Sequence, residues 1–315
     1  MAARNFGFSS TTDEVISGLD LSGKTAVVTG ASGGLGAETV RALAAGGASV
    51  TIGCRDTGKG QRIADSIKKS TGNDAIHVAA LELVDHASVR EFADDIGETY
   101  DALNILINNA GVMACPKTLT PQGWELQFAT NHLGHFLLTN LLVPLLVAGT
   151  PSRVICLSSA GHKGGAVDFG DLHFEHREYD KWVAYGQAKT ANALFAVGLD
   201  HRMAERGIRA FAVHPGAIPT DLGRHMDVDD MAAIGETIET SAGGYKDLAS
   251  GAATSVWAAT APELDGKGGL YLEDCGESAP AGTDGITTGY LDYAVDPKLA
   301  DRLWKISEEM VGQKF

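Results

Sequence analysis

The chain has 315 residues, of which 44% are hydrophobic and 21% are charged, a composition typical of a globular protein and not of a disordered one. Its formal net charge of −15 argues against nucleic acid or an anionic membrane as partner, because phosphate binding needs a basic face. The four cysteines are scattered without paired spacing, which favours a reducing compartment, and we expect a cytoplasmic protein.

The sequence contains no stretch that predicts a membrane span. Its most apolar segment, FLLTNLLVPLLV at 136–147, is 12 residues long and includes Asn140 and Pro144. That is too short to cross a bilayer, and it predicts a buried helix. The first residues, MAARNFGF, have no apolar run of signal-peptide length.

The chain alternates between strand-like and helix-like segments. Residues 1–20 form a polar extension in which SSTTDEV has helix-capping chemistry and predicts a small helix. KTAVVTG at 24–30, a helical pattern at 35–44 and ASVTIGC at 48–54 then form a βαβ unit. Five further strands are expected at 75–81, 104–111, 153–159, 208–216 and 268–274. The pattern predicts a single α/β domain over 1–315: a doubly wound Rossmann fold with a seven-stranded, mostly parallel sheet and helices on both faces.

A glycine-rich turn follows the first strand. TGASGGLG places glycines at 30, 34 and 36, where they would let the backbone pass close to a pyrophosphate at the start of the next helix. The cofactor-binding residues expected here are Gly30, Ser32, Gly33, Gly34, Leu35 and Gly36. A glycine-rich turn alone has a purely structural alternative, which its position in the first βαβ unit makes less attractive.

The residues at the end of the second strand should determine which of the two nicotinamide cofactors is preferred. It reads Cys54, Arg55, Asp56, and the Arg55 guanidinium could grip a 2′-phosphate that an acid would repel. We therefore predict NADP(H) over NAD(H), with Asp56 as the argument for NAD(H) and a solvated loop arginine as the alternative for Arg55.

Three more motifs follow in order: NNAG at 108–111, a serine pair after the strand at 153–159, and YGQAK at 185–189. Together with the glycine turn and HPG at 214–216, they make the chain resemble the short-chain dehydrogenase/reductase family, over roughly 21–257. The lead-in GLDLSGK and the strand end GCRD look most like the retinol dehydrogenase and WW-domain oxidoreductase branch.

The resemblance implies roles for particular residues. Ser159 would be catalytic, and Asn131 would hold an ordered water that links Lys189 to solvent. Relatives usually have Asp where Glu82 stands and a basic residue where Gly33 stands, so phosphate recognition would depend more heavily on Arg55. Further cofactor contacts implied by the resemblance are Glu82, Leu83 through its backbone, Asn109, Ala110, Tyr185, Lys189, Pro215, Gly216, Ile218 and Thr220.

Tyr185 and Lys189 stand four residues apart, which places both side chains on one helix face. A tyrosine that donates a proton near neutral pH needs its pKa, ordinarily about 10, to fall substantially. An ammonium about 4 Å away is worth about 4 kcal/mol at an effective dielectric near 20, which is the right size. Tyr185 is thus expected to be the general acid/base, Lys189 to stabilise its phenolate, and Ser159 to donate a hydrogen bond to the developing oxyanion.

The substrate side is less determined. Residues 221–249 are expected to be a mobile lid, with an ordinary surface excursion as the alternative, and 276–315 a C-terminal tail of open role. Phe169, Phe174, Met226 and Met231 offer apolar surface that suggests a small hydrophobic alcohol or carbonyl substrate. Tyr179 and Trp182 could line the pocket or pack the helix start.

The motifs leave three functions to compare. An NADP(H)-dependent alcohol dehydrogenase or carbonyl reductase is favoured over a catalytically silent NADP(H)-binding redox sensor, which would not need Ser159, Tyr185 and Lys189 together. A sugar-nucleotide epimerase or dehydratase would need a larger C-terminal domain. No metal is expected, although His162, His173 and His176 could be drawn as a site. The resemblance implies a homodimer or homotetramer that pairs through 190–199 and 136–147.

Overall fold

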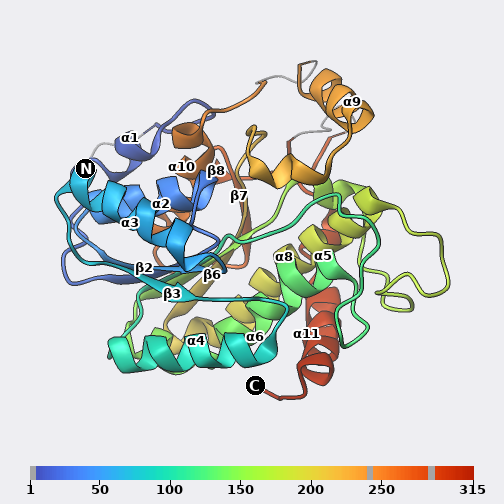
Figure 1. Ribbon diagram of the computed structural model, residues 1–315, viewed down its shortest axis with the longest axis horizontal. Coiled ribbons are helices and arrows are strands. Elements are labelled where there is room, and N and C mark those ends of the chain that lie inside the picture. The colour runs from blue at the N-terminus through green and yellow to red at the C-terminus, as the bar shows by residue number, and fades with distance from the viewer. Residues whose placement is uncertain (1–4, 240–243, 283–287) are drawn as a thin grey trace.

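The computed structural model describes residues 5–239, 244–282 and 288–315, and its strands form one sheet in the order β3-β2-β1-β4-β5-β6-β7-β8 (Figure 1). The strands are β1 (Thr25–Thr29), β2 (Ser49–Cys54), β3 (Ile76–Ala80), β4 (Ile105–Asn108), β5 (Ser152–Leu157), β6 (Ile208–His214), β7 (Leu270–Glu273) and β8 (Gly276–Glu277). The first seven are parallel, as predicted, and lie within the expected segments to a residue or two. The two-residue β8, antiparallel to β7, was not expected.

The order of the strands reverses at β1, which pairs with β2 on one side and β4 on the other. Val27 of β1 lies opposite Thr51 and Leu106, so the first and fourth strands end at nearly the same level. Such a reversal opens a crevice at the carboxyl ends of the strands. The glycine-rich turn after β1 lies at this point.

Helices cover both faces of the sheet, as Figure 1 shows. One face packs against α1 (Thr12–Ile16), α2 (Gly34–Ala45), α3 (Thr57–Thr71) and α10 (Leu248–Thr260). The other packs against α4 (His86–Thr99), α6 (Gly134–Leu141), α8 (Lys181–Met203) and α11 (Pro297–Val311). Each face has its own hydrophobic core, because side chains alternate between the two sides of a strand: Val27 faces the second core and Val28 the first.

The N-terminal extension forms the predicted small helix. The Thr11 side chain caps α1 by accepting from the Glu14 amide, and the Thr11 amide in turn donates to the Glu14 carboxylate at 2.7 Å. This capping box satisfies amides that the short helix cannot pair itself. Arg41 of α2 bonds the Asp13 carboxylate at 2.7 Å, which attaches the extension to the body.

The apolar segment 136–147 is divided between two helices. It fills α6 and then α7 (Val143–Ala148), with Pro144 in the first turn of α7, where proline is tolerated. Leu137, Leu138 and Leu146 are fully buried. Among the described residues, no helix has both the length and the apolar character that a membrane span requires.

The C-terminal tail ends in α11, which lies along α8 (Figure 1). The Trp304 ring meets Phe136 edge-on at 5.0 Å between centroids and Phe195 at 5.9 Å, and Arg202 pairs with Asp301 at 2.6 Å. The helix α11 thus covers Phe195 and Phe136, which belong to the two stretches expected to pair with a second subunit, 190–199 and 136–147. Pairing of two subunits through these stretches stays a prediction.

Candidate active site

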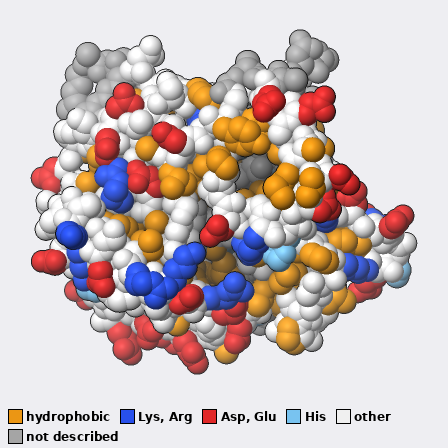
Figure 2. All heavy atoms as spheres, turned by 45° about the horizontal axis from the view of Figure 1, so that its top comes forward, with side chains coloured by type: hydrophobic (Ala, Val, Ile, Leu, Met, Phe, Trp, Pro, Cys, Tyr) orange, Lys and Arg blue, Asp and Glu red, His pale blue; other side chains and the backbone are white. Residues whose placement is uncertain are grey.

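The residues predicted to handle cofactor and proton lie around the carboxyl end of the sheet, after β1, β2, β4, β5 and β6. Figure 2 shows hydrophobic side chains gathered around a hollow, with Lys and Arg side chains below it.

The glycine-rich turn has the close approaches that its sequence predicted. Gly30 has φ +67°, and a Cβ there would lie 2.7 Å from the Ala110 Cα. A Cβ on Gly36 would lie 2.6 Å from the Asn109 Nδ2. These positions exclude any side chain, so the turn folds tightly against NNAG. The first amides of α2 follow Gly33, which has no side chain to accept from them, and they fit an anionic ligand such as a pyrophosphate.

NNAG is held to β1 through one hydroxyl. The Thr29 Oγ1 accepts from the amides of Asn109 and Ala110, each at 3.0 Å, and the Asn109 Nδ2 donates to the Thr29 carbonyl at 2.7 Å. The His135 Nε2 lies 2.8 Å from the same hydroxyl. Asn109 and Ala110 are therefore fixed beside the glycine turn, as a cofactor contact requires.

At the end of β2, the predicted selectivity residues Arg55 and Asp56 have different surroundings. The Asp56 carboxylate caps α3 by accepting from the Lys59 amide at 2.8 Å, so helix capping already occupies it. Arg55 is 69% exposed and its Nε lies 3.7 Å from a Glu82 carboxylate oxygen. Glu82 thus balances part of the Arg55 charge where a 2′-phosphate would lie.

Lys59 is a residue that the sequence interpretation missed. Its Nζ would lie only 3.5 Å from a Cβ on Gly33, and it lies 3.5 Å from the Asp221 Oδ2. The ammonium therefore lies beside Gly33, the position where the family resemblance implies a basic side chain. A second cation within one turn of Arg55 was the signal that could have identified it.

Leu35, Leu83 and Ile218, all predicted cofactor contacts, lie packed against helices of the body. Leu35 and Ile218 approach the Cβ position of Gly251 in α10 at 2.9 and 2.5 Å. The Leu83 side chain is buried in the core, and its carbonyl lies 2.3 Å from the Cβ position of Gly134. The sequence did not predict these close contacts with α10 and α6.

The HPGAIPT segment joins the glycine turn. Thr220 begins the 3₁₀ turn η4 (Asp221–His225), and its Cγ2 would lie 3.8 Å from a Cβ on Gly34. Gly216, next to Pro215, has φ +98°, and a Cβ there would meet the Lys246 Cδ at 2.9 Å. Lys246 is buried and bonds Asp274 at 2.6 Å. Buried packing therefore fixes this segment at the position expected for a cofactor contact.

Ser159, Tyr185 and Lys189 converge. Asp180 caps α8 by accepting from the amides of Trp182 and Val183, which sets the phase of the helix. Tyr185 and Lys189 then both face β5 and are buried, and the Lys189 Nζ donates to the Leu157 carbonyl at 2.9 Å. A Cβ on Gly161 would lie 2.9 Å from the Tyr185 Cε1 and 3.3 Å from the Ser159 Oγ, so the two side chains lie on the same glycine. The structure thus brings together the three predicted catalytic side chains.

Burial changes the pKa values of this pair. It raises the pKa of Tyr185 to about 12, against a smaller lowering by the Ser159 hydrogen bond. It lowers the pKa of Lys189 to about 8. The lysine Nζ lies 5.7 Å from the centroid of the tyrosine ring. The direction for Tyr185 is opposite to the expected one, because removal from water disfavours the phenolate more than Lys189 and Ser159 favour it.

Asn131 lies in a π-helical segment, η1 (Ala129–Leu133), between α5 (Leu126–Phe128) and α6. Its Oδ1 accepts from the Val112 amide at 2.8 Å and its Nδ2 donates to the Val112 carbonyl at 2.9 Å. The side chain therefore fixes the loop after NNAG. A Cβ on Gly111 would lie 3.7 Å from the Lys189 Nζ, so this loop borders the lysine.

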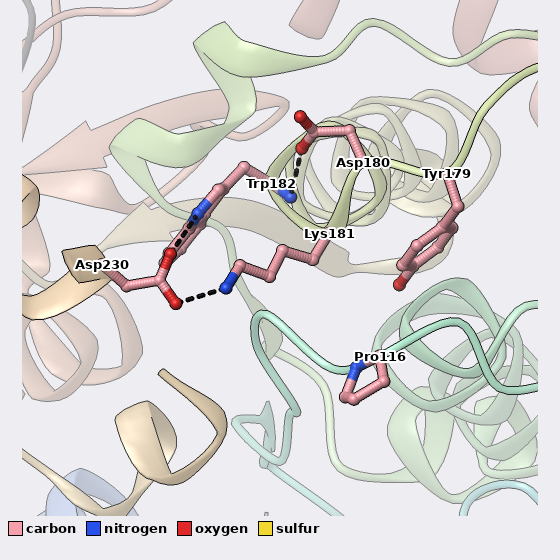
Figure 3. A pocket seen from close by; sticks show the side chains of 6 residues that line it. All are labelled: Pro116, Tyr179, Asp180, Lys181, Trp182 and Asp230. Atoms are coloured by element: carbon pink, nitrogen blue, oxygen red, sulfur yellow. Dashed lines mark hydrogen bonds and ion pairs between the residues drawn. The ribbon is translucent and has the colours of Figure 1, made fainter. Parts of the chain in front are cut away.

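A pocket of about 360 Å³ lies between the start of α8 and the segment after η4 (Figure 3). Tyr179 and Trp182 both line it, with Pro116, Asp180, Lys181 and Asp230. Asp230 belongs to α9 (Val228–Glu239) and accepts from the Trp182 Nε1 at 3.1 Å while pairing with Lys181. The predicted lid 221–249 thus lines this pocket through Asp230 of α9. Residues 240–243 of the lid lie outside the described residues.

The four apolar residues predicted to face the substrate do not line this pocket. Phe174 is buried and stacks edge-on with Tyr179 at 5.1 Å, and Phe169 lies under Arg302 of α11. Met231 is 53% exposed. Composition alone could not predict which way these side chains point.

The histidines considered as metal ligands lie apart. The His173 Nδ1 accepts from the Glu125 amide, whereas His162 is buried beside Ser159. Within the described ranges, no group of three or more His, Cys, Asp and Glu side chains is arranged to hold a metal ion.

Comparison with known proteins fits this geometry: residues 24–230 match the short chain dehydrogenase family. The chain belongs to the short chain dehydrogenase family. This short chain dehydrogenase is 46% identical over 303 residues to a probable oxidoreductase of Streptomyces lividans, covering 93% of this chain and 99% of that one. It is 40% identical to human retinol dehydrogenase 13, covering 92% and 85%.

Among solved structures, this short chain dehydrogenase is similar to the RhlG/NADP active-site complex of Pseudomonas aeruginosa, with a TM-score of 0.65 and 26% identity over 81% of this chain and 95% of that one. The family and the fold predicted from the motifs are therefore confirmed, and the chain is an oxidoreductase of this family.

Proposed function

We propose that the protein is an NADP(H)-dependent oxidoreductase that interconverts a hydrophobic primary or secondary alcohol and its aldehyde or ketone, with Tyr185 as general acid/base. The observation that carries this is the convergence of Ser159, Tyr185 and Lys189 beside a glycine turn that admits no side chains. When bound, a nicotinamide cofactor would supply or accept the hydride, and its oxidised ring would bring a positive charge.

In the reductive direction, a protonated Tyr185 suits the reaction. Its raised pKa keeps the proton on the phenol at neutral pH, ready to transfer to the carbonyl oxygen of the substrate. Ser159 would donate to the same oxygen as negative charge develops there. Lys189, whose pKa of about 8 leaves it largely charged at neutral pH, would stabilise the resulting phenolate.

In the oxidative direction, Tyr185 must first lose its proton. Burial opposes that loss, so alcohol oxidation needs either a high pH or a further positive charge beside the phenol. Reduction at neutral pH is therefore the direction that the residues favour.

Arg55 and Lys59 support NADP(H) over NAD(H). Both cations lie at the edge of the glycine turn, and Asp56, the argument for NAD(H), is engaged as a helix cap. A hydrophobic substrate is supported by the 40% identity to a retinol dehydrogenase, although the pocket at α8 is lined by aromatic and charged side chains together.

The test is a screen of lipophilic ketones and aldehydes with NADPH, comparing wild type with Tyr185→Phe. We expect turnover by the wild type and a loss of about 10²- to 10⁴-fold in the variant, with unchanged affinity for NADPH. Cofactor binding without turnover of any substrate by the wild type would favour the redox sensor, and full activity of Tyr185→Phe would refute the proposed mechanism.

A further inference from the structure

The peptide bond between Ser159 and Ala160 is held at both ends by side chains from outside the site. The Ser159 carbonyl accepts from the His162 Nδ1 at 2.6 Å and from the Tyr271 hydroxyl at 3.1 Å. The Ala160 amide donates to the His214 Nδ1 at 3.2 Å. His214 ends β6 and Tyr271 lies in β7, so two neighbouring strands and the η2 turn (Ala160–Gly164) fix this one peptide.

The proton on His162 is assigned by its second neighbour. The His162 Nε2 lies 3.2 Å from the Leu291 amide nitrogen, and a backbone N–H can only donate. Nε2 must therefore be the acceptor, which leaves the proton on Nδ1, where it faces the Ser159 carbonyl. Full burial supports the neutral ring by lowering the pKa of His162 to about 4.

Leu291 belongs to the C-terminal tail, which also holds the His162 backbone. The Tyr293 hydroxyl, two residues on, donates to the His162 carbonyl at 2.7 Å, and Thr190 of α8 approaches the same oxygen at 3.2 Å. The tail thus contacts the turn that follows Ser159 through both the ring and the backbone of His162.

We propose that His162 is a positioning residue for Ser159, and that the Leu291 amide of the C-terminal tail sets the His162 tautomer which makes it one. The proposal deepens the proposed function, on which its kinetic part rests. A misplaced Ser159 would weaken both its hydrogen bond to the substrate oxygen and its lowering of the Tyr185 pKa. The step affected is therefore proton transfer, and cofactor binding is not.

Two matched substitutions separate the two ring nitrogens. His162→Asn keeps an N–H donor close to the Nδ1 position, whereas His162→Gln keeps an acceptor close to Nε2 and loses the donor to Ser159. Losing one buried hydrogen bond predicts about a 5- to 10-fold lower kcat for His162→Gln, with His162→Asn within about 3-fold of wild type. KM and the Kd for NADPH should stay within about 2-fold in both variants.

A pH profile of alcohol oxidation gives a readout that a merely structural role would not move. The apparent pKa assigned to Tyr185 should be higher in His162→Gln than in His162→Asn. The other titratable groups near the Tyr185 and His162 rings are Lys189, Tyr271, Tyr293 and Lys163. Both variants leave these groups in place. His162→Gln combined with Ser159→Ala should be no slower than Ser159→Ala alone, because the histidine acts through the serine.

The tautomer itself can be observed without turnover. In ¹⁵N NMR spectra of the protein labelled at histidine, the His162 signal should show a protonated Nδ1, and Leu291→Pro, which removes the amide donor, should shift it toward a mixture. An Nε2–H tautomer in the wild type would overturn the proposal, as would equal kcat values for the Asn and Gln variants. Absence of any turnover in the wild type would instead refute the proposed function and leave the tautomer measurement decisive.

Discussion

Cofactor selectivity gives the sharpest test of the site. It depends on the position of Lys59 beside Gly33, which the sequence did not predict. Two unit charges about 4 Å apart interact by about 1 kcal/mol in water and about 4 kcal/mol at an effective dielectric near 20. Lys59 is 45% exposed, so about 1–2 kcal/mol is reasonable for its contact with a 2′-phosphate. Lys59→Ala should therefore weaken NADP⁺ binding by about 5- to 30-fold.

Arg55 is more exposed and shares its charge with Glu82 at 3.7 Å. About 1 kcal/mol, or about 5-fold, is expected for Arg55→Ala. If the two contacts are independent, the double variant should lose about 30- to 100-fold. Asp221→Asn removes the carboxylate beside Lys59 and should strengthen NADP⁺ binding by a few-fold.

The assay is the Kd for NADP⁺ and for NAD⁺, measured by calorimetry at low salt. NAD⁺ has no 2′-phosphate, so its Kd is an internal control for each variant. Lys69→Ala, on the exposed surface in the last turn of α3, is the matched control and should leave both values unchanged. If the double variant keeps the wild-type ratio of the two constants, the assignment of Arg55 and Lys59 to the phosphate is refuted.

Two further predictions concern stability. Trp304→Ala empties the buried site against Phe136 and should lower the free energy of unfolding by about 3–5 kcal/mol in urea titrations. It should also promote association of the protein in size-exclusion chromatography. A loss under 1 kcal/mol would contradict the role of α11 as a cover of α8. Burial lowers the pKa values of His132 to about 3 and of His135 and His162 to about 4, so the unfolded state binds protons first as pH falls. The melting temperature should therefore fall steadily from pH 6.5 toward pH 4. The corresponding loss in the free energy of unfolding is up to roughly 3 kcal/mol per histidine. A melting temperature that stays constant between pH 6.5 and pH 5 would contradict this.

The sheet was predictable because its strands are short buried runs in strict alternation with amphipathic helices. The same holds for the glycine turn, whose close approaches to Ala110 and Asn109 leave no room for a side chain. Family motifs then identified Ser159, Tyr185 and Lys189, which the fold brings together. These features depend on local pattern or on residue order, and both are present in the sequence.

What the sequence could not give depends on contacts between distant segments. Lys59 lies beside Gly33 only because α3 packs next to the turn, and Phe174 points into the core although its neighbours in sequence form the pocket loop. The pKa of Tyr185 was expected to fall on the strength of one neighbour. The sequence shows that Lys189 is near, but it does not show how completely water is excluded from the phenol.

The tail 276–315 explains why α8 can hold a buried tyrosine and lysine in fixed positions. A helix this apolar needs cover on the side away from the sheet, and α11 provides it within the chain through Trp304 and the pair of Arg202 with Asp301. Near the other end of α8, Leu291 and Tyr293 hold the turn that carries Ser159. Because one segment fixes both the helix with Tyr185 and the turn with Ser159, loosening the tail should disturb proton transfer before it disturbs the binding of a cofactor at the proposed contacts on the glycine turn and α3.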